Sequence, residues 1–186
     1  MKQEEFCRCR PGMTVWFTGL PSAGKSTIAH ELAARMLTDG RRVAVLDGDE
    51  LGKSLAAGLG FGREDRHTNV QRIGMLSEVL ARNGIVVLVP VIAPYAVSRE
   101  AVRKRHQEAG VAYVEVHVAA PVEVCRKRDV KGLYMQQTRG EMSGLSGVDA
   151  PYEVPGFPDL RIPSHTQSIP ESVNDVWHLL ATRELV

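Results

Sequence analysis

The sequence predicts an α/β fold in three layers, in which helices cover both faces of a mostly parallel five-stranded sheet. Short apolar runs alternate along the chain with longer segments of helical periodicity, which is the order of βαβ units. The run at residues 85–89 is apolar throughout, as in a strand that is buried on both faces. The chain has 186 residues, of which 44% are hydrophobic and 24% charged, as expected for one domain with a single core.

The predicted strands are short runs of mostly apolar and β-branched residues, bounded by glycine, proline or charged residues. They cover residues 13–18, 42–46, 85–89, 112–118 and 160–162. In a parallel sheet the carboxyl ends of the strands share one edge, and ligands bind in the crevice beyond that edge. Polar residues that directly follow a strand are therefore the first candidates for a binding site.

The predicted helices carry apolar residues every three or four positions. The first has Ile28 and Leu32 on one face, and the last has Val173 and Val176. Between them, helices are expected after Asp49, from Val70 to an end at Asn83-Gly84, from about Val97 to Ala109, and after Pro121. The helix that starts near Val97 has a strongly charged face, which we expect to be on the surface.

One stretch shows no such period. Residues 129–158 are rich in Gly, Pro, Lys and Arg. A segment of this length inside a compact domain is usually functional, and often a lid. We therefore expect a flexible tail over residues 1–12 and a single domain over residues 13–186, with the lid at about 129–158.

Composition excludes several classes of function. The formal net charge is +1, so there is no electrostatic reason to expect a nucleic-acid partner. No apolar run reaches the length of a transmembrane helix, and the first residues lack the apolar core of a signal peptide. The three cysteines, Cys7, Cys9 and Cys125, form neither a disulfide framework nor a complete zinc site. We therefore expect a cytoplasmic protein in a reducing compartment, with no membrane partner.

The stretch from Gly19 to Ser26 reads Gly-Leu-Pro-Ser-Ala-Gly-Lys-Ser and fits the phosphate-binding pattern of Gly, four residues, then Gly-Lys-Ser. Its glycines let the backbone approach phosphate oxygens closely, and successive amide groups can point inward at an anion. Lys25 would add positive charge near the β- and γ-phosphates, and Ser26 would offer a hydroxyl to Mg²⁺. A strand before this loop and a helix after it are the context that such a P-loop requires.

A glycine-rich turn that matches this pattern by chance is the alternative, and the flanking strand and helix argue against it. The sequence therefore predicts a P-loop NTPase-like fold. The residues expected to bind ATP in the loop are Gly19, Leu20, Pro21, Ser22, Ala23, Gly24, Lys25, Ser26 and Thr27.

Asp47 and Asp49 follow the second predicted strand, at the same edge of the sheet as the P-loop. Two carboxylates there could hold Mg²⁺, in part through water, and accept a proton from an attacking hydroxyl. Taken alone, such a pair is more often a turn and a helix cap. Beside a P-loop, the functional interpretation is favoured.

Arg63, Arg66 and Arg72 lie close in sequence to Phe61 and Asn69. They form either a solvated charged face, or a pocket in which arginines bind an anionic substrate and an aromatic ring stacks on a base. The residues alone leave both interpretations open. Further along, five basic residues between positions 126 and 139 lead into the predicted lid. A closing lid would bring them over the charge that develops during phosphoryl transfer.

Taken together, these motifs resemble the adenylylsulfate kinase family over nearly the whole chain, from about Thr14 to Leu180. The P-loop alone would not identify that family, whereas the further motifs in this order are highly specific. They are Leu46-Asp47-Gly48-Asp49, Gly58-Leu59-Gly60-Phe61, Asp65-Arg66-x-x-Asn69, Arg72-Ile73-Gly74, Pro94-Tyr95, Cys125-x-x-Arg128-Asp129, Lys131-Gly132-Leu133-Tyr134 and Gly147-x-Asp149-x-Pro151-Tyr152-Glu153.

The resemblance implies an enzyme that transfers the γ-phosphate of ATP to the 3′-hydroxyl of adenosine 5′-phosphosulfate, with Mg²⁺ as cofactor. The product would be 3′-phosphoadenosine 5′-phosphosulfate, used in sulfate assimilation. The resemblance also implies a homodimer. Lys25, Asp47 and Asp49 would be catalytic, Ser26 and Asp47 would serve Mg²⁺, and Arg128 would lie against the base of ATP. The small nucleotide acceptor would be bound by Asp49, Phe61, Arg66, Asn69, Ile92, Lys131 and Leu145.

Five positions depart from the family's pattern; two of them are Gln71, where an arginine is common, and Ser146, where a threonine is common. Gly52 stands where an arginine is usual, and Leu145 stands where a second aromatic ring would stack on the acceptor base. Ala93 replaces a serine that has been proposed as a phosphorylated intermediate, so direct in-line transfer remains. Losing a cation and a ring could each weaken binding by about 1–3 kcal/mol. The alternative is therefore a related kinase that phosphorylates a different nucleotide or a small alcohol.

Two other classes of protein share part of this pattern. The stretch Asp49-Glu50-Leu51-Gly52 matches the Asp-x-x-Gly of GTPase switches, but the sequence has no Asn-Lys-x-Asp motif to read guanine. An inactive homologue kept as a binding partner is the other possibility. The intact Lys25 and Asp47 argue against it.

Overall fold

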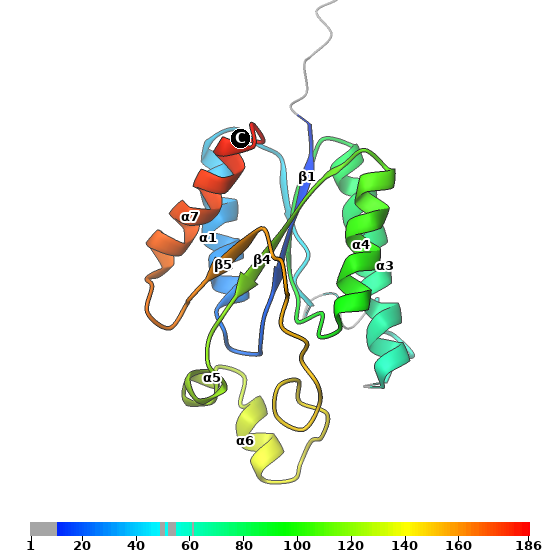
Figure 1. Cartoon of the computed structure of the whole chain (residues 1–186), viewed down its shortest axis with the longest axis vertical. Helices are drawn as coiled ribbons and strands as arrows, with labels where there is room; N and C mark the ends of the chain where they lie inside the picture. The colour runs from blue at the N-terminus through cyan, green and yellow to red at the C-terminus, as the bar shows by residue number, and fades with distance from the viewer. Residues whose placement is uncertain (1–10, 49–50, 52–54, 61) are drawn as a thin grey trace, which may run out of the picture.

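In the computed structural model, which describes residues 11–48, 51, 55–60 and 62–186, five strands form one sheet (Figure 1). The strand order is β2-β3-β1-β4-β5, and each neighbouring pair is parallel. The predicted α/β class with a parallel five-stranded sheet is confirmed. The strands are β1 (Met13–Thr18), β2 (Val43–Val45), β3 (Val86–Pro90), β4 (Ala112–Val118) and β5 (Leu160–Ile162).

Helices cover both faces of this sheet, which gives the three predicted layers (Figure 1). One face carries α1 (Lys25–Thr38) and α7 (Ile169–Thr182), and the other carries α3 (Arg63–Arg82) and α4 (Ala96–Glu108). Two short helices, α5 (Val122–Arg128) and α6 (Leu133–Thr138), lie beyond the carboxyl ends of the strands.

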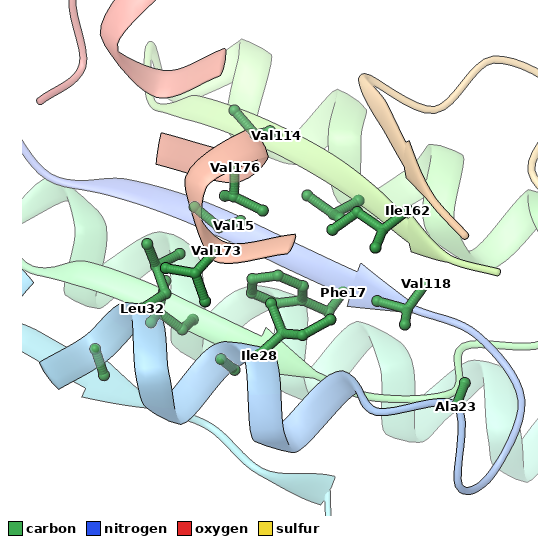
Figure 2. Close-up of a cluster of buried hydrophobic side chains, with 14 of the residues drawn as sticks. Val15, Phe17, Ala23, Ile28, Leu32, Val114, Val118, Ile162, Val173 and Val176 are labelled. Atoms are coloured by element: carbon green, nitrogen blue, oxygen red, sulfur yellow. The ribbon is translucent and has the colours of Figure 1, made fainter. Parts of the chain in front are cut away.

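The larger part of the core lies between the sheet and the α1–α7 face. Figure 2 shows Phe17 of β1 among Ile28 of α1, Val173 and Val176 of α7, and Val118 of β4. All five side chains are buried. Burying a large apolar side chain of this kind stabilises the folded state by about 1.5–3 kcal/mol. This packing fixes both β1 and α1, the two elements that the P-loop connects.

A second cluster lies under the α3–α4 face, where Trp16 of β1 packs with Ile73 of α3 and Val102 of α4. The two helices approach closely because α3 has a glycine at the crossing. A Cβ atom added to Gly74 would lie 2.6 Å from Cγ2 of Val102, well inside van der Waals contact. The absence of a side chain at position 74 therefore sets the spacing of this layer.

Helix α3 is longer at its start than the predicted segment, which began at Val70. Residues 63–69 are mostly charged or polar and therefore show no apolar period. Three of them, Asp65, Arg66 and Asn69, line a cavity instead of packing into the core. Acidic residues Glu64 and Asp65 in the first turn also suit the positive end of the helix dipole.

The predicted lid is not a single irregular segment, because it contains α6. Asp129 explains where this helix begins: its carboxylate accepts hydrogen bonds from the backbone N–H groups of Tyr134 and Met135, both at 3.0 Å. These two N–H groups belong to the first turn, which has no partner inside the helix. A helix of six residues is too short to show a sequence period.

Two predicted segments, one at the N-terminus and one after Asp49, lie mostly outside the described residues. Residues 1–10 of the expected tail lie outside the described residues, whereas the backbone carbonyl of Pro11 accepts a hydrogen bond from Arg41 at 2.8 Å. Most of the short helix expected after Asp49 also lies outside them. Of the cysteines, Cys125 is described and is a buried free thiol. Across the described parts of the chain, no helix is long and apolar enough to cross a membrane.

We expect Gly74→Ala to lower the free energy of unfolding by about 1–3 kcal/mol, because the added methyl group overpacks the contact with Val102. Urea unfolding measures this change. The control is the double variant Gly74→Ala with Val102→Ala, in which space is restored and the combined loss should be smaller than the sum of the single losses. A Gly74→Ala protein as stable as the parent would contradict this packing.

Candidate functional site

The P-loop joins the end of β1 to the start of α1 and bends sharply between them. Gly19 has φ 154° and lies so close to β4 that an added Cβ would be 2.4 Å from the carbonyl oxygen of Val118. Gly24, which caps α1, has φ 105°, a conformation that side chains disfavour. Because α1 begins at Lys25, the unpaired N–H groups of its first turn belong to the loop and can face an anion.

Lys25 is buried within the loop, with an exposed fraction of 8%. Its ammonium donates hydrogen bonds to the carbonyl oxygens of Gly19, at 3.0 Å, and Leu20, at 2.8 Å. Burial and, to a smaller extent, the nearby charge of Lys131 lower the pKa of Lys25, and Asp47 acts in the opposite direction; the net pKa is about 8. The pKa of Lys25 is therefore close to neutral pH. Its charge interacts with Lys131 of the lid and with Asp47 at the end of β2.

Asp47 follows β2 and is also buried, with an exposed fraction of 7%. Its backbone carbonyl accepts a hydrogen bond from the N–H of Leu51 at 3.0 Å, as in a helical turn. The side chain lines the same cavity as the P-loop. Its predicted partner Asp49 lies outside the described residues, as does Phe61.

A cavity of about 850 Å³ opens at the carboxyl ends of the strands. It has the size expected of a site for small molecules. Its walls come from the P-loop, the end of β2, the turn after β3, the start of α3, the lid, and the connection from β5 to α7. The predicted site residues that line it are Pro21, Ser22, Ala23, Gly24, Lys25, Ser26, Thr27, Asp47, Arg66, Asn69, Ile92, Arg128 and Lys131.

The three arginines of α3 have different surroundings in the structure, and only Arg66 is among the residues that line the cavity. Arg66 lines the cavity and donates hydrogen bonds to the Ser146 hydroxyl, at 2.7 Å, and to the carbonyl of Gly144 in the lid. Arg63 stacks over the ring of Tyr95, with its guanidinium carbon 4.8 Å from the ring centre. Arg72 donates to the carbonyl of Leu55 at 2.7 Å. Arg66 therefore remains the candidate for binding an anion.

Gly19, Leu20 and Leu145 were also expected at the site but are not among the residues that line the cavity. Gly19 and Leu20 instead supply the carbonyl groups that hold Lys25. Leu145 is 3% exposed and packs with the α1–α7 part of the core. This placement follows from its apolar side chain and gives no support to contact with a substrate base.

Arg128 lies at the end of α5 and ties two walls of the cavity together. Its guanidinium donates to the carbonyl oxygens of Ala23, at 3.3 Å, and Ser164, at 2.6 Å. The Ser164 hydroxyl donates to the same Ala23 carbonyl at 2.6 Å. The sequence prediction missed the residues of this connection that line the cavity, Ser164, Gln167, Ser168 and Ile169. They carry no motif, and their only signal was that they follow a predicted strand.

The described residues contain no group of three or more His, Cys, Asp or Glu side chains that could hold a metal ion. Mg²⁺ needs no such group, since it is usually held by one or two protein oxygens together with water and substrate phosphates. The Ser26 hydroxyl and the Asp47 carboxylate both line the cavity beside the P-loop. These two oxygen ligands fit a Mg²⁺ ion that is bound together with a nucleotide.

Comparison with known proteins agrees with this geometry. The adenylylsulphate kinase family model matches residues 11–163. The chain belongs to the adenylylsulfate kinase family. It is 46% identical to the probable adenylyl-sulfate kinase of Synechocystis, over 91% of this chain and 93% of that protein.

Solved structures of adenylylsulfate kinases are similar as well. The Mycobacterium tuberculosis APS kinase CysC, in complex with AMPPNP and APS, has a TM-score of 0.89 and 42% identity, covering 92% of this chain and 98% of that chain. The hexameric APS kinase from Thiobacillus denitrificans has a TM-score of 0.72 and 35% identity, covering 96% of this chain and 30% of that chain. The P-loop kinase fold predicted from the sequence is confirmed.

The state of Lys25 leads to a prediction about nucleotide binding. Bound phosphates raise the pKa of a lysine that they contact, so above pH 8 we expect binding of ATP to be accompanied by uptake of part of a proton. For the same reason, affinity should fall as pH rises through about 8. Calorimetry at pH 8.5 in two buffers of different ionisation enthalpy measures the uptake.

The Lys25→Ala variant is the control for this titration, since it should bind without proton uptake. Lys131→Ala should shift the uptake to higher pH, because it removes the like charge that helps to lower the pKa of Lys25. Binding by the parent protein without proton uptake at pH 8.5 would show that Lys25 is not the titrating group.

Proposed function

We propose that the protein transfers the γ-phosphoryl group of ATP to the 3′-hydroxyl of adenosine 5′-phosphosulfate. The observation that carries this proposal is the shared cavity. A P-loop with a buried lysine, an acid at the end of β2, and Arg66 with Asn69 of α3 all line one hollow of about 850 Å³. Donor and acceptor can therefore bind side by side. Family membership and the relative solved with AMPPNP and APS support this assignment of substrates.

The donor would bind along the P-loop, with its phosphates at the first turn of α1. Lys25 would leave its two carbonyl partners in part and contact the β- and γ-phosphates. Arg128, already fixed against Ala23 and Ser164, would lie beside the base. Mg²⁺, held by Ser26 and Asp47, would neutralise charge on the phosphate oxygens.

The acceptor would bind on the α3 side, where Arg66 and Asn69 face the cavity together with Ile92 of the turn after β3. A guanidinium suits the phosphosulfate end because it donates in pairs to anionic oxygens. Lys131 of the lid lines the same space and would close over both substrates. The roles of Asp49, Phe61 and Leu145 in acceptor binding remain predictions from the resemblance.

The reaction would be a single displacement. The acceptor's 3′-oxygen would form a bond to the γ-phosphorus while the bond to the β,γ-bridging oxygen breaks, which releases ADP, and Asp47, which lines the cavity, would take the hydroxyl proton. The resemblance implies that Asp49 would also be catalytic. The residue at the turn beside the acceptor is Ala93, which has no nucleophilic side chain, so the transfer is direct. Lys25 would stabilise the charge that develops on the phosphoryl group.

The homodimer and the cytoplasmic location are further proposals. A cytoplasmic location suits a chain whose described cysteine is a buried free thiol. The homodimer follows from the family resemblance, and a solved relative is itself described as hexameric. On the basis of the family resemblance, we propose that two copies of this chain associate.

We expect Lys25→Ala to lower kcat by roughly 10²–10³-fold, since a buried positive charge is lost from the transferring group. Asp47→Asn should lower kcat by roughly 10²–10⁴-fold and change ATP affinity much less, because the amide cannot accept the proton. Lys104→Ala, on the exposed face of α4, is the matched control. Initial rates at saturating substrates give kcat, and unchanged kcat in Lys25→Ala would contradict the assignment of the loop.

A panel of acceptors tests the function itself. Purified protein with Mg-ATP should release ADP with adenosine 5′-phosphosulfate, and phosphorus NMR should show a new 3′-phosphate. Adenosine monophosphate, adenosine and small alcohols serve as the comparison, since Gly52 and Leu145 raise the alternative of a different acceptor. ADP release with one of these and none with adenosine 5′-phosphosulfate would replace the proposal with that alternative. No ADP with any acceptor would indicate an inactive homologue.

A further inference from the structure

A network of hydrogen bonds outside the cavity joins the turn beside the acceptor to the end of the lid. Its centre is Arg99 of α4, which is 3% exposed although its helix was expected to present a charged face to solvent. Its guanidinium donates to the carbonyl oxygens of Ala93, at 2.7 Å, and Glu153, at 2.8 Å. A third bond, at 3.1 Å, goes to the carboxylate of Glu115 in β4. A buried charge is thus placed where it binds two backbone segments 60 residues apart in sequence.

The same two segments also bind each other directly. The backbone N–H of Glu153 donates to the carbonyl of Pro94 at 2.8 Å. In return, the carboxylate of Glu153 accepts from the N–H of Ala96 at 2.7 Å, which satisfies the first residue of α4. The end of the lid segment is therefore attached to the turn by side-chain and backbone bonds together.

Tyr152 links this unit to the P-loop strand. Thr18, the last residue of β1, donates from its hydroxyl to the carbonyl of Ile92 at 2.5 Å, because a carbonyl can only accept. The Tyr152 hydroxyl lies 3.1 Å from the Thr18 oxygen and must then be the donor. Burial raises the pKa of Tyr152 to about 12, so this proton stays in place at physiological pH.

These contacts matter for the site because the turn they hold lines the cavity. Ile92, Ala93 and Pro94 form part of the wall near Arg66 and Asn69. Ala93 has φ 42°, which a residue with a Cβ rarely adopts, so the turn keeps this shape only while its surroundings hold it. The bonds to Arg99 and Thr18 involve two successive carbonyl groups of the turn, those of Ile92 and Ala93.

We propose that Arg99 and Tyr152 are positioning residues that hold the turn at Ile92–Pro94 and the end of the lid as one unit, so that acceptor binding and lid closure are coupled. We call Thr18, Ala93, Arg99, Tyr152 and Glu153 the Arg99 clamp. The proposal rests on the proposed function, since it assigns the acceptor to this side of the cavity. Neither positioning residue is among those that line the cavity, so they would act through the backbone that they hold.

Tyr152→Phe is the sharper test, because it removes one hydroxyl and keeps the ring beside His117. We expect the acceptor KM to rise about three- to tenfold, as for the loss of one hydrogen bond, with the KM for ATP changed less than about twofold. Arg99→Lys keeps the charge but cannot bind both carbonyls as a planar fork, and its acceptor KM should rise further. Hydrogen exchange of residues 129–158 should show weaker protection by the acceptor in both variants.

Arg103→Gln is the matched control. Arg103 lies one turn further along α4 and binds the same Glu115, at 3.2 Å, together with Asp159 at 2.8 Å. It shares the buried ionic network but makes no bond to the turn or to Glu153 among the described contacts. This variant should lose thermal stability while both KM values stay near those of the parent.

The outcomes separate the two proposals. No ADP from the parent protein with adenosine 5′-phosphosulfate would overturn the proposed function. An active parent with an unchanged acceptor KM in Tyr152→Phe would overturn the Arg99 clamp as a positioning device. Equal rises in the KM values for ATP and acceptor, or the same kinetic change in Arg103→Gln, would also overturn it, since they indicate a general structural loss.

Discussion

The site depends on a central strand that cannot shift. β1 is hydrogen-bonded on both sides, to β3 and β4, and its side chains enter the core on both faces of the sheet. The P-loop starts where this strand ends and finishes where α1 packs against it. A loop whose two ends are fixed in this way can hold a backbone conformation that would otherwise relax, such as that of Ser22, which has φ 60° although it carries a Cβ. The phosphate-binding geometry is therefore a property of the core as much as of the loop.

The cations around the cavity already have hydrogen-bond partners before any substrate is present. Lys25 donates to two loop carbonyls, Arg128 donates to the carbonyl of Ser164, and Arg66 donates to the carbonyl of Gly144. Lys25 is buried, and a buried cation without partners is strongly unfavourable, so its two carbonyl partners stabilise the site in the absence of anions. The hydrogen bonds also fix the cations where phosphate and sulfate groups would need them, which reduces the reorganisation required on binding.

The sequence was most informative where a period or a motif was present. β4 and β5 were predicted to the residue, and the spacing of the P-loop and Asp47 placed both at the edge of the sheet where the cavity lies. Ser164 was missed because its contact with the P-loop depends on tertiary packing. Leu145 shows the reverse case, since alignment with a family position did not bring an apolar side chain to the cavity. Arg99 was expected on the charged, exposed face of its helix, but it is buried. Helical periodicity could not show that it would pair with the carboxylate of Glu115 in β4.

Helix α6 attaches the first part of the lid to the P-loop. Its Tyr134 is buried and donates a hydrogen bond from its hydroxyl to the carbonyl of Pro21 in the P-loop at 3.1 Å. The first part of the lid is thereby anchored to the very loop it has to cover. Ordering the backbone of one residue costs about 1–2 kcal/mol of conformational entropy at room temperature. Because the lid is already bound to the P-loop at Tyr134, fewer of its residues have to be ordered when it closes. More of the binding energy of the two nucleotides is then left to hold them tightly.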